Sequence, residues 1–167
     1  MKVRRVVAGL HPQRPPGDGI EAIAELARSM EAELLGLFIE DAALLHFAAL
    51  PFAREIGAAS ATRRAVDLAA MERFMRERAA QLRGHLEEVL GTHPLPWSFR
   101  VARGTIAQQL LAAAIESPGP TLLLPPGASL GDAPLVVTIT ELDEARLCEL
   151  LAAERPILIL PDQASSA

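Results

Sequence analysis

The residues most able to do chemistry in this chain are its four histidines and its single cysteine (His11, His46, His85, His93 and Cys148). The histidines show no HExxH pattern or other metal-ligand spacing, so we expect no metal site. His11 follows an apolar run, but a solvent-exposed loop histidine is the simpler interpretation. Cys148 lies in a helical pattern with no base near it in the sequence, and we expect a buried, inert thiol. No Ser/His/Asp or Cys/His spacing indicates an enzyme.

Two glycine-containing stretches could instead hold a phosphate. Residues 3–19, VRRVVAGLHPQRPPGDG, pass from an apolar run into a Pro- and Gly-rich loop, and residues 127–131, GASLG, follow another apolar run. The second stretch could form a small anion nest, although a plain turn is the simpler interpretation. In an α/β sheet a ligand sits at the carboxyl ends of the strands. A pocket there would use Gly9, Leu10, His11, Phe38 and Gly127.

The elements that would position these residues alternate between strand and helix. Apolar runs predict strands near residues 6–10, 33–40, 97–103, 121–124, 135–140 and 157–160, and helical periodicity predicts helices over 20–30, 62–90, 106–116 and 141–154. The alternation predicts an α/β fold, with a parallel sheet and helices on both faces. The strand over 97–103 has one polar face, which is typical of a sheet edge. The apolar segment 44–52 either covers a sheet edge or forms a lid or docking surface.

Composition narrows the classes of partner. The chain has 167 residues and a net charge of −5, and it lacks the basic surface that nucleic-acid binding requires. No apolar run approaches the roughly 18 residues that span a bilayer. The first residues are too polar for a signal peptide, and a single cysteine fits a reducing compartment. We therefore expect a cytoplasmic protein that binds neither nucleic acid nor membrane.

The local sequences of several predicted elements resemble those of the universal stress protein family. The resemblance lies in the leading VRRVVAGL, in AELLGLFIED, in VARG opening a helix, in TLLLPP and in the closing RPILILP. It implies a flavodoxin-like, parallel five-stranded sheet of order 3-2-1-4-5, with residues 135–140 available as one extra strand. It also implies a homodimer through the last strand. We expect one such domain over residues 1–161 and a disordered tail over 162–167.

The chain departs from the nucleotide-binding members of that family at both of their signatures. His11 stands where those members have an Asp, and Pro125 and Pro126 replace the first glycine of the phosphate loop. Asp143 and Glu144 fall near the place of the family's Gly-Ser or Gly-Thr pair. Proline has no N–H to donate, and carboxylates repel phosphate.

The resemblance and these departures together predict a non-enzymatic stress-response or regulatory protein without a cofactor. The alternative is a module that binds ATP or AMP with altered phosphate contacts, through the five pocket residues named above.

Overall fold

The computed structural model describes residues 2–12, 19–41, 57–91 and 93–162; side chains are described there except at 41 and 57–67. The apolar segment 44–52 and most of the expected disordered tail lie outside the described residues. The described elements are β1 (Arg5–Leu10), α1 (Gly19–Met30), β2 (Glu33–Asp41), α3 (Gly57–Leu90), β3 (Trp97–Gly104), α4 (Ile106–Glu116), β4 (Thr121–Leu124), β5 (Leu135–Thr138), the 3-10 turn η2 (Ile139–Glu141), α5 (Glu144–Leu151) and β6 (Ile157–Leu160).

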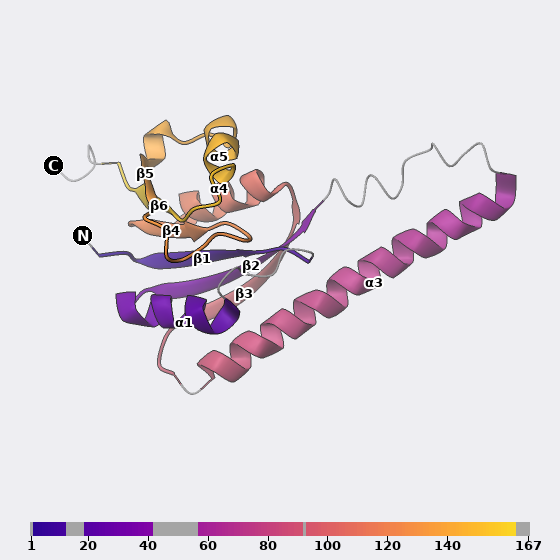
Figure 1. Ribbon diagram of the computed structural model, residues 1–167, viewed down its shortest axis with the longest axis horizontal. Coiled ribbons are helices and arrows are strands. Elements are labelled where there is room, and N and C mark those ends of the chain that lie inside the picture. The colour runs from indigo at the N-terminus through magenta and orange to yellow at the C-terminus, as the bar shows by residue number, and fades with distance from the viewer. Residues whose placement is uncertain (1, 13–18, 42–56, 92, 163–167) are drawn as a thin grey trace.

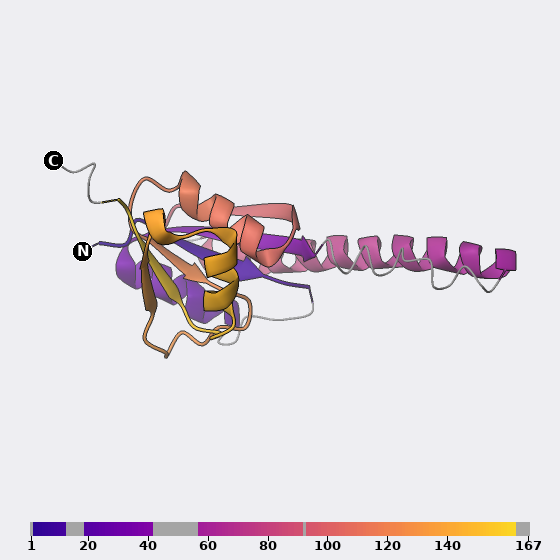
Figure 2. The same cartoon turned by 90° about the horizontal axis from the view of Figure 1, so that it is seen from above.

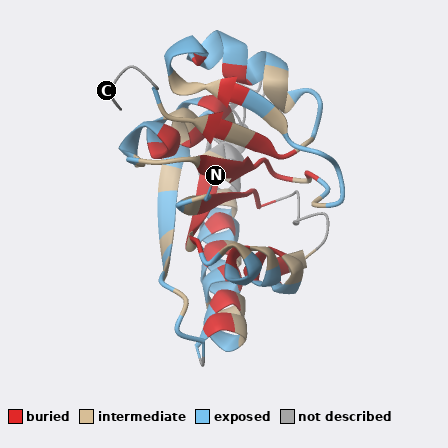
Figure 3. Ribbon diagram, turned by 90° about the vertical axis from the view of Figure 1, so that its left-hand side faces the viewer, coloured by how far each residue is buried: buried red, intermediate tan, exposed pale blue. Residues whose placement is uncertain are grey.

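These elements form an α/β structure around one mostly parallel sheet, as predicted. The strand order is β3-β2-β1-β4-β6-β5. Helices α1 and α3 pack on one face and α4 and α5 on the other, so the sheet lies between two helical layers (Figure 1). The core follows the alternation of the strands: Val6, Ala8 and Leu10 face α1 and α3, whereas Val7 faces α4. Buried residues concentrate in the sheet and on the helix sides that face it (Figure 3).

The prediction of an all-parallel, five-stranded sheet is wrong at its last strands. The described sheet has six strands, and β6 runs antiparallel to β4 while β5 is parallel to β6. No described helix lies between β4 and β5 to return the chain to the amino edge, so β5 starts where β4 ends and runs back. Helix α5 then supplies the crossover that makes β5 and β6 parallel. The extra strand is shorter than expected, because residues 139–141 form a 3-10 turn.

This arrangement changes which strands lie at the edges. β6 has β4 on one side and β5 on the other, so its backbone has no open side for the expected last-strand dimer. The two edge strands of the described sheet are β3 and β5. The prediction that residues 97–103 form an edge strand is confirmed.

Helix α3 is much longer than the sheet that it covers. It has 34 residues and begins at Gly57, earlier than the predicted start near residue 62. At 1.5 Å per residue it is about 51 Å long, against about 30 Å for the nine residues of β2. Met75, Leu82 and Leu86 recur at helical spacing and are buried against the sheet. The amino-terminal part therefore extends past the carboxyl ends of the strands (Figures 1 and 2).

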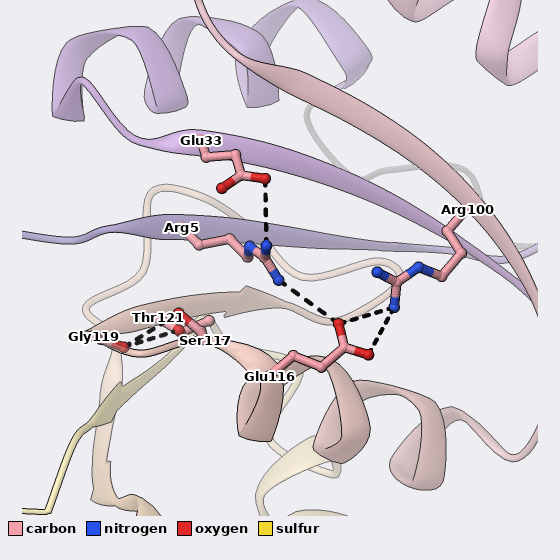
Figure 4. A network of polar contacts seen from close by, with 7 residues as sticks. All are labelled: Arg5, Glu33, Arg100, Glu116, Ser117, Gly119 and Thr121. Carbon is pink, nitrogen blue, oxygen red and sulfur yellow. Dashed lines mark hydrogen bonds and ion pairs between the residues drawn. The ribbon is translucent and has the colours of Figure 1, made fainter.

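A network of charged side chains ties the end of α4 to the amino half of the sheet (Figure 4). Arg5 donates from Nη2 to Glu33 Oε1 at 3.3 Å, and its Nη1 lies 3.9 Å from Glu116 Oε2. Arg100 donates from Nη1 to both carboxylate oxygens of Glu116 at 3.1 Å. Because two arginines from separate strands share Glu116, the last turn of α4 is held over β1 and β3. The role of these ion pairs is structural: they connect the end of α4 to the sheet.

Candidate functional site

The predicted ligand position is the carboxyl edge of the sheet between β1 and β4. From β1 the chain adds β2 and β3 on one side, and α4 then carries it over the other face to β4 on the opposite side of β1. The strand order therefore reverses at β1 and β4, which is where α/β sheets form a crevice for a ligand. In flavodoxin-like proteins, a nucleotide cofactor binds at this position.

Beside this position, a proline packs against the backbone of β1. A Cβ on Gly9 would lie 2.9 Å from Pro126 Cδ, 3.2 Å from the carbonyl oxygen of Leu124 and 3.4 Å from Leu110 Cδ2. The Pro126 ring therefore packs directly on the backbone of Gly9, and a side chain of α4 closes the same space. Pro125 and Pro126 are both buried. The backbone of Gly9 is thus covered by protein.

The other predicted pocket residues are brought near one another, but their side chains point into the core. Leu10 and Phe38 are paired across β1 and β2, and both belong to the core on the α1 and α3 face. Leu10 is 1% exposed and Phe38 is 0% exposed. A fully buried phenylalanine has no face on which a base could stack. In this structure the two side chains are part of the hydrophobic core.

His11 is buried, not solvent-exposed as expected. It follows β1 directly and is 7% exposed, and the next residue, Pro12, is also buried. The apolar run of β1 carries the chain inside the protein for two residues beyond the end of the strand. His11 therefore belongs to the interior of the described protein.

Gly127 lies in a turn immediately after the two prolines. Its φ of +80° is in the left-handed region, which glycine adopts without strain. Ala128 N–H donates to the carbonyl oxygen of Pro125 at 3.0 Å, and Asp132 N–H donates to that of Ser129 at 3.4 Å. One amide of this stretch and the amide that follows it are therefore used inside the loop. The geometry at Gly127 is that of a turn, the simpler of the two interpretations of GASLG.

The amino end of α4, at the same edge of the sheet, is occupied by its own capping box. Gln108 N–H donates to Thr105 Oγ1, and Thr105 N–H donates to Gln108 Oε1. A helix start attracts anions through its unpaired N–H groups, and here two of these donors are already satisfied. Next to it, Arg103 Nε and Nη2 both donate to Glu40 Oε2 at 3.2 Å.

Cys148 is exposed on α5, so the prediction of a buried thiol is wrong. The reason is that Leu147, one position earlier, takes the buried face of that short helix. Across the residues that the structure describes, no group of three or more His, Cys, Asp or Glu side chains is placed to hold a metal ion.

Two adjoining hollows lie at the opposite, amino edge of the sheet. One, of about 180 Å³, lies between α1 and the end of α3; the other, of about 350 Å³, lies under residues 93–96, and Arg28 and His93 line both. His85 Nε2 lies 2.7 Å from Glu21 Oε1 at the rim. The pKa of Glu21 is lowered by a hydrogen bond from its own backbone and by His85, and the pKa of Glu25 is lowered by Arg28. Both pairs are exposed: Glu21 and His85 join α1 to α3, and Glu25 and Arg28 both lie on α1. None of the predicted pocket residues lies here.

A scan against models of protein families finds no match to the chain, and a search of curated proteins finds none either. Among the described residues, no helix combines the length and the hydropathy needed to cross a bilayer.

The role of Pro126 could not be read from the sequence pattern. The two prolines were noted there for the N–H group that each lacks, but the packing of Pro126 on Gly9 joins residues 117 positions apart. The sequence does show a glycine near the end of one strand and a proline soon after the end of another. Only the register of β1 with β4 brings them together.

The contact predicts the effect of a single methyl group. We expect Gly9→Ala to destabilise the protein by about 1–3 kcal/mol, because the new Cβ meets the Pro126 ring and the Leu124 backbone. The matched control is Gly84→Ala on α3, where an added Cβ meets nothing within 4 Å. A helical Gly→Ala change there should stabilise by about 0.5–1 kcal/mol. Urea unfolding measures both changes; equal stability of the two variants would show that the crevice is open at Gly9.

Proposed function

We propose that the chain is a non-enzymatic stress-response or regulatory protein of the universal stress type, with a flavodoxin-like fold and a cytoplasmic location. We propose further that it works without ATP or another cofactor. The observation that carries the proposal is the packing of Pro126 on Gly9 at the point where the strand order reverses. A nucleotide phosphate in such a crevice approaches the backbone closely, and the proline ring takes that space.

The burial of the neighbouring residues supports the same proposal. Phe38 and Leu10 fill the core, and His11 is buried where nucleotide-binding members carry an Asp. Asp143 is the N-cap of α5 and accepts from Arg146 N–H at 2.7 Å, so this carboxylate serves the protein's own helix. The alternative of a nucleotide module with altered phosphate contacts would require Pro126 to move away from Gly9.

A thermal shift series with millimolar ATP, ADP, AMP and cyclic AMP tests the proposal. We expect no change in the melting temperature with any of them. A nucleotide present at about a hundredfold above its Kd would stabilise the protein by about 2.7 kcal/mol and raise the melting temperature by several degrees. The Gly84→Ala variant calibrates the assay, because its smaller expected stabilisation must be detectable. A nucleotide-dependent rise comparable to that of the variant would reject the proposal in favour of the nucleotide module.

We also propose a homodimer, formed through β3. Leu34 N–H donates to the carbonyl oxygen of Pro96, and the alternation of a strand then directs the backbone groups of Phe99, Val101 and Arg103 away from β2. β3 has eight residues, twice the length of β5, and Val101 is 48% exposed at its centre. Arg103 is already paired with Glu40 within the chain, which limits repulsion between two copies.

The dimer is tested by the mass in solution. We expect light scattering to give about twice the chain mass of 17.8 kDa. Val101→Pro removes an outward N–H at the middle of β3 and should yield the monomer. Val136→Pro makes the equivalent change on the other edge strand and should leave the dimer intact. A wild-type protein that stays monomeric at high concentration would refute this part of the proposal.

A further inference from the structure

The edge formed by β5 differs in its chemistry from the edge formed by β3. On β3, Arg100 and Arg103 are charged, and each is engaged in an ion pair within the chain. Residues 133–140, APLVVTIT, carry no charge at all. Val136 is 61% exposed on β5, and no strand of the described sheet lies beyond it.

The backbone of β5 presents a defined set of hydrogen-bonding groups on its open side. Leu135 N–H donates to the carbonyl oxygen of Pro156 at 2.9 Å, so Leu135 and Val137 face β6. Because successive residues of a strand face opposite sides, the N–H and C=O groups of Val136 and Thr138 point outward. Arg155 donates from Nε to the carbonyl oxygen of Ala133 at 3.0 Å and fixes the start of the strand.

Acidic residues stand at both ends of this uncharged edge. Asp132 precedes it, and Glu141, Asp143 and Glu144 follow it; all four are exposed. Two cations lie nearby: Arg146 is paired with Glu149, and Arg155 is bonded to the backbone at Ala133. The end of the edge at residues 141–144 is therefore negative, its centre is neutral, and at its start the charge of Arg155 lies beside that of Asp132.

We propose that β5 is a docking strand for an extended segment of another protein, with a neutral, β-prone centre and Lys or Arg on both flanks. Such a segment would add a strand to the sheet, a recognised mode of peptide binding in which the backbone supplies the hydrogen bonds. One basic flank would meet Glu141 and Glu144, and the other would lie beside Asp132 and Arg155. A second copy of this chain presents Asp132 and Glu141, not Lys or Arg, at the two ends of its own uncharged segment.

The test uses the full chain and a fluorescein-labelled peptide, Lys-Arg-Val-Thr-Val-Thr-Arg-Lys, in a fluorescence anisotropy titration. We expect saturable binding that weakens as salt is added. Val136→Pro should weaken it by about tenfold or more, because it removes an outward donor. Val101→Pro, the same change on the opposite edge, should bind the peptide as the wild type does.

Three outcomes would overturn the proposal. They are absence of binding by the wild-type protein, equal binding of the charge-reversed peptide Glu-Asp-Val-Thr-Val-Thr-Asp-Glu, and unchanged binding by Val136→Pro. The charge-reversed peptide decides the matter even where a proline variant fails to fold. Light scattering on Val136→Pro adds a fourth: conversion of a wild-type dimer to a monomer would make β5 a self-interface instead.

Discussion

The close packing of Gly9 against Pro126 is the constraint on which the rest of the carboxyl edge depends. β1 and β4 are neighbours in register, with Ala8 opposite Leu124, so Gly9 near the end of β1 lies beside the first residues after β4. Without a Cβ at Gly9, the proline ring and Leu110 can approach the backbone. The turn at Gly127 follows from this contact, because the chain must leave the buried prolines and reverse toward β5. At the position where related architectures hold a ligand, this chain therefore packs Pro126 and Leu110 against the backbone of β1.

The carboxyl-terminal third of the described chain changes the sheet in a second way. β5 and β6 form a parallel unit of their own around α5, and this unit attaches to β4 in the antiparallel sense. It covers the side of β4 that would otherwise be an edge, and it moves the open edge outward to a short, uncharged strand. The two edges that result are chemically different: β3 is long and carries paired arginines, and β5 is short and is bracketed by acids. We infer two different partners from this difference.

Sequence reasoning predicted the parts of the fold that local patterns determine. The apolar runs located β1 to β4, and helical periodicity located α1 and α4. The direction of β6 was not predictable, because four apolar residues form the same pattern whether their neighbour is parallel or antiparallel. The burial of His11 and the exposure of Cys148 were missed for a related reason. Each depends on which side of an element faces the core, and for short or terminal segments the sequence pattern leaves that open. The contact of Gly9 with Pro126 required the strand order itself.

The most direct test of a closed crevice is to identify any small molecule that stays bound to the protein when it is purified from its own cells. The protein would be purified from its own cells and denatured, and the supernatant would be assayed by mass spectrometry for released small molecules. We expect no nucleotide or other small molecule in stoichiometric amount, because Pro126 takes the space over Gly9. Release of about one nucleotide per chain would contradict the closed crevice and would show that this edge of the sheet binds a ligand.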